Sequence, residues 1–356
     1  MESIQTRNRI RGKNMQTKIY RKIDKISSLW NKLYKNGMEM SFFQSYEWNT
    51  ALEINFQEKK FENYRKTLLY YVFDNSLIAP IIIDKAKKQI TILGQNEPSD
   101  YLSFIFNKFD EELFTEAITL IMKDYQSYTF LLDKINESNP MVNALQQGLN
   151  QFNIQEVDKD CVYVPTQNGK ETFYSSLSKR VRQNYRTAKN KLQKEGHFFC
   201  LKIGTDIVSE HKAQELYNLY KSRRDDCDYR NVILKKILKA LKLIKNNIFQ
   251  KKSLDVLTSY SQQTKVFLSE IYIDDELAAF CEGNYNNRAN VISIARIATN
   301  NKFYSYSPGQ ILLIDTIEYI RNKVVYFDLT RGAEDYKFKL GGVRHTNKCF
   351  TIYSER

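Results

Sequence analysis

Residues 265–298 read KVFLSEIYIDDELAAFCEGNYNNRANVISIARIA, and this stretch decides the fold. It holds three runs rich in apolar and β-branched residues, which the polar pairs Asp274-Asp275 and Asn286-Asn287 separate. Such pairs tolerate left-handed backbone and favour tight turns between antiparallel strands. The pattern therefore predicts three meandering strands, over Lys265–Ile273, Leu277–Gly283 and Ala289–Ala298.

A loop, a helix and a fourth strand are expected after this meander. The loop is Thr299–Tyr306, and Pro308–Arg321 has the apolar spacing of an amphipathic helix. Val324–Leu329 is a short apolar run that predicts a strand, and Phe350–Tyr353 predicts another.

The first half of the chain repeats this order. Three predicted strands, a polar loop, a helix and a fourth strand follow one another at Thr67–Phe73, Leu77–Ile83, Gln89–Leu93, Gly94–Asp100, Glu111–Tyr125 and Tyr128–Leu132. Further helices are predicted at Phe42–Phe56 and Pro140–Phe152, and a further strand at Cys161–Val164. A period of about 200 residues is too long for a solenoid, so two copies of one mixed α/β (α+β) domain explain it better.

The domain boundaries follow from this repeat. We expect a basic N-terminal extension with a first helix at 1–40, in which Arg7, Arg9, Arg11 and Lys13 resemble a solvated tail. The first domain is expected at 41–165 and the second at 166–356. A helical insert at about 174–248 is expected to open the second domain.

Composition excludes several classes of protein. The 356 residues include 54 Lys+Arg and 41 Asp+Glu, for a formal net charge of +13, which either a solvated surface or an anionic ligand explains. Five scattered cysteines and three histidines favour a reduced cytoplasmic protein and argue against disulfides or a metal site. No apolar run is long enough to predict a membrane helix, although peripheral membrane contact stays open.

The junction Tyr306-Ser307-Pro308-Gly309-Gln310 is the first candidate site. Ser307 suits the N-cap, Pro308 suits the first helical turn, and Gly309 allows a ligand to approach the backbone. The free N–H groups of a helix start favour an anion. The alternative is an ordinary, well-capped helix.

The second candidate site follows the strand that contains Phe327. Asp328 on an apolar strand needs a partner, and we expect an ion-paired corner with Arg331 or Lys337. Tyr336 is a candidate acid, because a phenol can protonate a leaving thiolate. A purely structural corner is the alternative.

Two further segments have ambiguous roles. Ser178–Glu195 predicts a basic helix, which is either a solvated face or a site for a phosphorylated or nucleic-acid ligand. The loop that ends in Ser99-Asp100-Tyr101 stands where the second half has its anion junction, but its acids Glu97 and Asp100 would repel phosphate. The first half is therefore expected to have lost cofactor binding and to face the acceptor.

Taken together, these segments resemble a known family. The combination Tyr306-Ser307-Pro308-Gly309, a helix, and Phe327-Asp328…Arg331-Gly332…Glu334…Tyr336-Lys337 is similar to the signature of the CelD/BcsL-type acetyltransferases of the GNAT superfamily. The resemblance spans residues 41 to about 345. This chain has Asn300 and Ala333 where that family often has acids.

The resemblance implies two tandem GNAT folds with mostly antiparallel central sheets flanked by helices. It also implies acetyl-CoA or another acyl-CoA as co-substrate. The implied cofactor-binding residues lie on the third strand and the helix start: Ile294, Arg296, Ile297, Tyr306, Ser307, Pro308, Gly309 and Gln310. Tyr336 is the implied acid and Glu282 a candidate base. The implied acceptor site contains Asp100, Tyr101, Asp328, Arg331 and Lys337.

Three functions remain open. The first is transfer of an acyl group to an amine or hydroxyl of a sugar, nucleotide sugar or exopolysaccharide precursor. The second is a Fem-like transferase that uses aminoacyl-tRNA, which the net charge and the basic helix favour. The third is a degenerate GNAT protein that only binds RNA or a partner.

Overall fold

The computed structural model describes residues 4–10, 13–36, 41–149, 152–167, 171–227, 256–286 and 289–354. Its strands are β1 (Ile4–Ile10), β2 (Lys13–Tyr20), β3 (Lys66–Phe73), β4 (Leu77–Asp84), β5 (Gln89–Ile92), β6 (Ile105–Phe106), β7 (Thr129–Asn136), β8 (Phe152–Pro165), β9 (Phe199–Asp206), β10 (Val266–Ile273), β11 (Glu276–Asn286), β12 (Val291–Thr299), β13 (Tyr326–Arg331) and β14 (Val343–Ser354). Its α-helices are α1 (Ser27–Asn36), α2 (Tyr46–Glu58), α3 (Glu111–Asp124), α4 (Pro140–Gln146), α5 (Phe173–Ser176), α6 (Lys179–Lys194), α7 (Glu210–Cys227), α9 (Val256–Ser261), α10 (Pro308–Ile320) and α11 (Asp335–Lys339). Three 3-10 helices are η1 (Ile23–Ile26), η2 (Phe42–Gln44) and η3 (Asn301–Tyr306).

The predicted repeat is present. In each half, three antiparallel strands lead through a helix to a fourth strand that pairs parallel with the third: β3-β4-β5-α3-β7 and β10-β11-β12-α10-β13. Turn residues Asp74, Asn75, Asp274 and Asp275 all have positive φ, as their side chains favour. The mixed α/β class and the helix-flanked, mostly antiparallel sheet are therefore confirmed.

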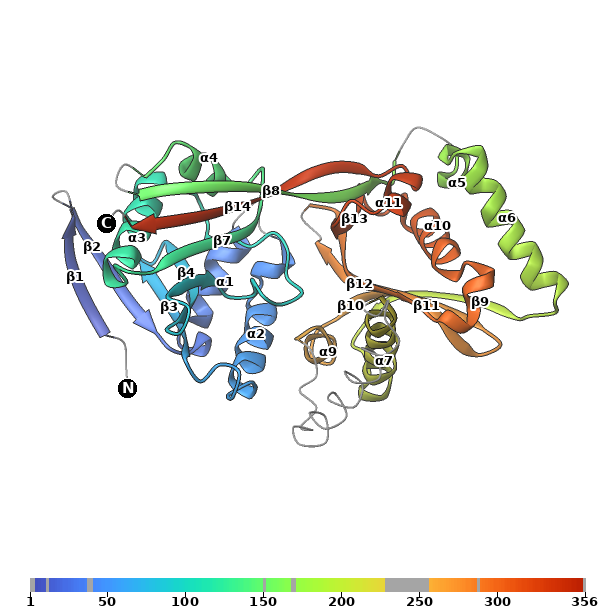
Figure 1. The fold of residues 1–356 in the computed structure, drawn as a ribbon, viewed down its shortest axis with the longest axis horizontal. Helices are drawn as coiled ribbons and strands as arrows, with labels where there is room; N and C mark the ends of the chain where they lie inside the picture. The colour runs from blue at the N-terminus through green and yellow to red at the C-terminus, as the bar shows by residue number, and fades with distance from the viewer. Residues whose placement is uncertain are drawn as a thin grey trace, which may run out of the picture.

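The two halves exchange their last strands. β14, at the end of the chain, pairs with β7 of the first half, while β8 pairs with β13 of the second half. β8 and β14 also pair with each other along 12 residues. They lie side by side and connect both halves (Figure 1). The described strands thus form one sheet, in the order β1-β2-β3-β4-β5-β7-β14-β8-β13-β12-β11-β10-β9, with β6 paired to β4.

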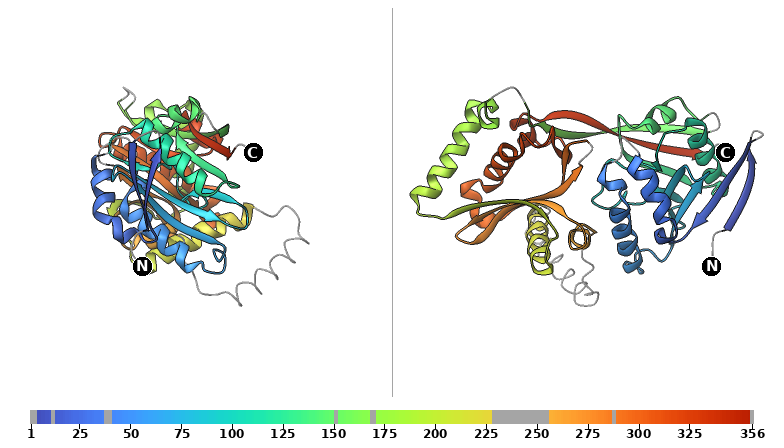
Figure 2. Two further views of the ribbon diagram at one scale, coloured as in Figure 1. Left: turned by 90° about the vertical axis from the view of Figure 1, so that its left-hand side faces the viewer. Right: turned by 180° about the vertical axis from the view of Figure 1, so that it is seen from behind.

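Helices cover the second half of this sheet on two faces. α5, α6 and α10 lie on one face, and α7 and α9 lie on the other (Figures 1 and 2). α9 also packs against α2 of the first half, where Tyr260 meets Trp48 with ring centroids 5.1 Å apart. The α7 face therefore shares the hydrophobic core of the first half, and the α10 face has a core of its own.

A bulge in β12 changes which side chains face α10. The register with β11 shifts between Glu282 and Gly283, so Ala295 has no direct partner. Ile292 and Ile294 pack in the α10 core before the bulge, and Ile297 does so after it. Further on, β12 and β13 pair only as far as Ser293 and Asp328. Beyond that point the two strands separate, and an edge of β12 is left open.

Several element predictions need correction. β1 and β2 pair with each other and β2 pairs with β3, so the basic start contains two strands that were not predicted. The expected helical insert contains strand β9, which pairs with β10, and its part from 228 to 248 lies outside the described residues. α4 ends at Gln146 rather than Phe152. Among the helices that the structure describes, none is long and apolar enough to cross a membrane.

Candidate functional site

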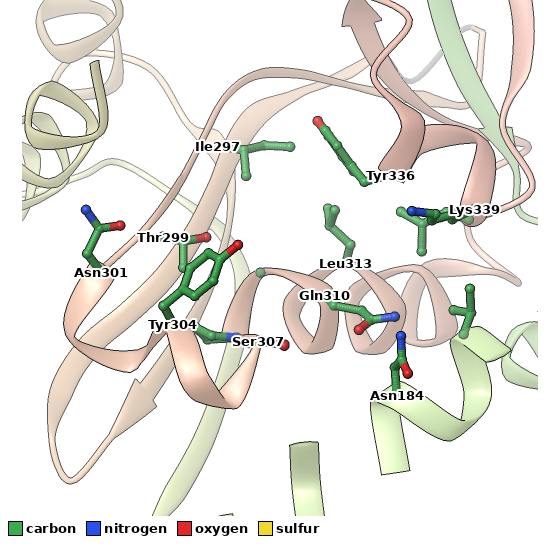
Figure 3. A pocket seen from close by; sticks show the side chains of 14 residues that line it. Asn184, Ile297, Thr299, Asn301, Tyr304, Ser307, Gln310, Leu313, Tyr336 and Lys339 are labelled. Carbon is green, nitrogen blue, oxygen red and sulfur yellow. The ribbon is translucent and has the colours of Figure 1, made fainter. Parts of the chain in front are cut away.

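A pocket of about 620 Å³ lies at the open edge of β12 (Figure 3). Strand β12, η3 and the helices α6, α10 and α11 supply its walls. Its lining residues are Val181, Asn184, Ile297, Thr299, Asn301, Tyr304, Ser307, Pro308, Gly309, Gln310, Leu313, Tyr336, Lys339 and Leu340. The two segments that stood out in the sequence, the junction before α10 and the residues after β13, therefore meet in one cavity.

The start of α10 forms one end of the pocket. Ser307 is left-handed (φ 49°), and its side chain does not cap the helix, contrary to our expectation. Its carbonyl instead accepts from the backbone N–H groups of Gln310 and Ile311. A Cβ on Gly309 would lie 2.8 Å from Thr299 Oγ1, so glycine allows this close approach of helix and strand. The positive end of the α10 dipole points at the cavity and favours an anion there.

The short helix α11 brings Tyr336 to the opposite wall. In Figure 3, Tyr336 and Ile297 lie on one side of the cavity, and Gln310 and Asn184 on the other. The following residue, Lys337, is 2% exposed and does not face the pocket. Its ammonium donates to the carbonyls of Leu329, Thr330, Arg331 and Gly332 and pairs with Glu334 at 3.0 Å. Lys337 therefore holds the strand end together, and its assignment to the acceptor site stays a prediction.

Two predicted residues point away from the pocket. Arg296 donates to the Glu282 carboxylate (Nε–Oε2 2.6 Å), and both side chains are buried. Arg296 also donates to Thr258 of α9 and lies 6.0 Å from the ring of Tyr220 on α7. The bulge thus turns Arg296 to the α7 face, and its assignment as a cofactor ligand stays a prediction. Glu282 is buried in the same ion pair and does not line the pocket.

Two more of the predicted cofactor residues lie elsewhere. Ile294 is 2% exposed in the α10 core and does not line the pocket. Tyr306 turns toward the end of α6, where its hydroxyl contacts His197 and Glu195. The neighbouring Tyr304 lines the pocket instead, at 77% exposure. The sequence analysis did not include Tyr304. In a 3-10 helix, side chains two positions apart point to different sides, so Tyr304 and Tyr306 do not share one face.

The predicted acceptor residues of the two halves do meet. Arg331 Nε lies 2.5 Å from Asp100 Oδ1, and the Tyr101 hydroxyl donates to Asp328 Oδ1 at 2.8 Å. Asp328 also accepts from the backbone N–H of Thr330. It therefore bonds to Tyr101 and Thr330, and not to Arg331 or Lys337 as expected. The expected ion-paired corner is thus replaced by a contact between halves, at which His345 Nε2 lies 3.3 Å from the Tyr101 hydroxyl.

Burial changes the acid–base properties of this contact. It raises the pKa of Asp100 to about 6, although Arg331 and Lys134 oppose the rise. Burial likewise raises the pKa of Asp328 and lowers the pKa of His345. Tyr101 and Thr330 have φ of 52° and 53°, a left-handed conformation that costs non-glycine residues about 1–3 kcal/mol. Raised carboxyl pKa values and backbone strain at one place are typical of functional sites.

In the first half, the segment that follows β5 is buried. After β5, residues 99–106 are buried, and the Leu102 N–H donates to the Lys134 carbonyl on β7. The Lys134 ammonium donates to the Ser99 carbonyl at 2.9 Å, and Trp48 Nε1 donates to Ser99 Oγ at 3.0 Å. The expected lack of a cofactor site in the first half stays a prediction.

Helix α6 forms a wall of the pocket through Val181 and Asn184. Val181, Ala188 and Leu192 of this helix are buried, and Tyr185 is partly buried. The basic residues of α6 were expected to form either a ligand-binding face or a solvated face. Asn184 was not predicted as a residue that lines the pocket. Within the described ranges, no group of His, Cys, Asp and Glu side chains could hold a metal ion.

The comparisons with known proteins agree with this geometry. Residues 179–338 match the family model for the acetyltransferase (GNAT) domain, and this segment contains most of the residues that line the pocket. No curated protein matches the chain.

Several solved structures share the fold of both halves. A conserved protein of unknown function from Bacteroides thetaiotaomicron is 10% identical, with a TM-score of 0.51, and the match covers 93% of this chain and 96% of that one. The C-terminal domain of a putative lysylphosphatidylglycerol synthetase from Agrobacterium fabrum is 8% identical, with a TM-score of 0.52 and coverage of 94% and 93%. L-PGS from Bacillus licheniformis is 12% identical, with a TM-score of 0.53 and coverage of 94% and 92%. At these identities, the similarity concerns the fold.

Proposed function

We propose that the protein is an acyltransferase that moves an acetyl or longer acyl group from acyl-CoA to an amine or hydroxyl. The observation that carries this proposal is the pocket itself. It joins the start of α10, the open edge of β12 and the phenol of Tyr336 within a GNAT domain. The start of α10 would supply an anion site, the edge of β12 would supply backbone N–H donors, and Tyr336 would supply a proton.

Each part has a role in the transfer. The pyrophosphate of the donor would lie at the start of α10, beside Gly309. Backbone N–H groups of β12 beyond the bulge would polarise the thioester carbonyl. The acceptor nitrogen or oxygen forms a bond to the carbonyl carbon, and the C–S bond breaks. The thiolate then takes the Tyr336 proton, while the proton of the acceptor leaves through water, because Glu282 is paired with Arg296.

The acceptor would bind where the two halves meet. Asp100, Tyr101, Asp328 and Arg331 place carboxylates, a phenol and a guanidinium there, which suit hydroxyl and amino groups. Arg331 is the most accessible of them, with 41% of its side chain exposed. Together with the resemblance to CelD/BcsL-type proteins, this polar set supports a sugar, nucleotide sugar or exopolysaccharide precursor as acceptor.

A Fem-like use of aminoacyl-tRNA is the second candidate. Helix α6 borders the pocket and carries exposed cations, among them Lys179, Arg180, Arg186 and Lys194. Such a face suits the phosphates of tRNA. This function predicts RNA binding that weakens steeply with salt, and donor transfer from aminoacyl-tRNA but not from acetyl-CoA.

Calorimetry with acetyl-CoA tests the proposal. Gly309→Glu adds a carboxylate at the anion site and a Cβ that collides with Thr299, so it should abolish binding. Gly204→Glu is the matched control, because Gly204 lies on strand β9 with open space around its Cα. Gly94 of the first half is a poor control, since its φ is +93° and a Cβ would meet Ser99. Wild-type protein that does not bind acetyl-CoA, or equal loss in both variants, would contradict the proposal.

A further inference from the structure

Hydrogen bonds link four titratable side chains, and one of them belongs to Tyr306, the residue before Ser307. His197 Nδ1 lies 2.6 Å from Asp274 Oδ2, and His197 Nε2 lies 2.8 Å from the Tyr306 hydroxyl. That hydroxyl donates to Glu195 Oε2 at 2.5 Å. We propose that His197 is a positioning residue for the donor pocket, which holds the turn at Ser307 through Tyr306 and does so best when protonated.

The turn needs support from outside itself. Ser307 is left-handed, which is unfavourable for a residue with a Cβ, and its hydroxyl makes no cap. Tyr306 directly precedes it, and its ring packs edge-on against His197 at 5.1 Å and lies 4.8 Å from the Lys191 ammonium. Asp274 in turn accepts from the Phe198 N–H. These hydrogen bonds therefore connect η3 to the end of α6 and to the β10–β11 turn.

Protonation decides how many of these bonds form at once. An imidazolium donates to both Asp274 and the Tyr306 oxygen, which leaves the tyrosine proton for Glu195. A neutral ring has only one N–H. If that N–H donates to Asp274, the Tyr306 hydroxyl can donate its single proton either to His197 or to Glu195, but not to both. The uncharged state therefore loses one contact in the support of the turn.

Charged groups of both signs surround the ring. Asp274 faces it from the β10–β11 turn, and Glu195 Oε2 lies 4.0 Å from Nε2 at the end of α6. The hydrogen bond from His197 is also the main cause that lowers the pKa of Asp274. The cations nearby act in the opposite direction: Lys191 over Tyr306, Lys302 of η3, and Lys189 in the same surface hollow as His197. Because the uncharged ring supports the turn with one contact fewer, donor binding should weaken as pH rises.

Calorimetric titration with acetyl-CoA at several pH values tests this inference, which rests on the proposed function for its donor. Across a pH series from about 5 to 8, the wild-type Kd should rise roughly tenfold more than that of His197→Asn. Comparing variants removes the titration of the ligand's own phosphate. Tyr306→Phe should behave like His197→Asn, and His211→Asn on α7 like wild type. Equal pH profiles for wild type and His197→Asn would overturn the inference.

A second measurement needs no ligand. Hydrogen–deuterium exchange of peptides that cover residues 300–312 should be faster in His197→Ala than in wild type or His211→Asn at the same low pH. Unchanged exchange would also overturn the inference. If wild-type protein does not bind acetyl-CoA, the proposed function fails, while the exchange result still decides whether His197 supports the turn.

Discussion

At the scale of single residues, Tyr336 and Lys337 are neighbours with separate roles. Tyr336 lines the pocket, whereas the buried Lys337 ammonium is fully occupied by carbonyls and Glu334. The sequence pattern grouped Lys337 with Asp328 and Arg331, because it could not show where each side chain turns. One residue of the motif thus faces the proposed chemistry, and the next one anchors the helix that presents it.

Tyr336→Phe should remove the proton donor of the leaving thiolate and little else. Positioned acids contribute about 10²–10⁴-fold, so turnover of acetyl-CoA, with water or amino sugars as acceptor, should fall on that scale. The Kd of acetyl-CoA and the melting temperature should not change. Tyr319→Phe, on an exposed position of α10, is the control. Wild-type turnover in Tyr336→Phe would show that the tyrosine is structural.

Lys337→Met should destabilise the protein. It leaves several buried carbonyls without a donor, and each unsatisfied buried group costs about 1–3 kcal/mol. We expect a loss of about 3 kcal/mol or more in the free energy of unfolding by urea denaturation. Lys339→Met, two residues later with 58% of its side chain exposed, should change it by less than about 0.5 kcal/mol. Similar losses in both variants would argue against the clamp.

At the scale of elements, the bulge in β12 determines the composition of the pocket. Without the bulge, simple alternation from Ile294 would put Arg296 on the side of α10. The extra residue at Ala295 instead turns Ile297 and Thr299 toward α10. Gly283 makes this possible, because a Cβ there would lie 2.1 Å from the Ser293 carbonyl oxygen.

Gly283→Ala should therefore disturb both the sheet and the pocket. The added methyl group meets backbone, which cannot rotate away, and overpacking of this kind typically costs about 1–3 kcal/mol. We expect a lower melting temperature and weaker acetyl-CoA binding than in wild type. Gly204→Ala, in open space on β9, is the control and should change neither. A fully stable Gly283→Ala variant with normal binding would show that the bulge relaxes at little cost.

At the scale of the whole molecule, the contact between halves makes stability depend on pH. Burial raises the folded-state pKa of Asp100 to about 6, above the value of about 3.9 in an unfolded chain. The native state therefore binds the extra proton between about pH 4 and 6, and the contribution of Asp100 to stability falls as pH rises through this window.

Asp100→Asn removes that titration. The difference in unfolding free energy, wild type minus variant, should decrease by up to about 3 kcal/mol from pH 4 to 6. Urea denaturation at a series of pH values measures it. Asp335→Asn, whose side chain is 81% exposed, is the matched control. A difference that stays constant, or grows, between pH 4 and 6 would contradict the raised pKa.

The sequence by itself determined the elements and their repeated order. Turn pairs such as Asp274-Asp275, the spacing of apolar residues, and the junction at Ser307-Pro308-Gly309 depend on neighbours within a few positions. Those properties also placed Tyr336 after a strand and Gly309 at a helix start. The pocket could be predicted to that extent, because both segments flank the same α10–β13 unit.

Only the tertiary structure decided the partners of these residues. The exchange of β8 and β14, the bond from Tyr101 to Asp328 across 227 positions, and the burial of Glu282 with Arg296 join segments remote in sequence. No local pattern encodes such contacts, since they follow from how the two halves of the sheet and their cores pack. The same packing buries residues 99–106 of the first half and leaves an open pocket beside α10 in the second half.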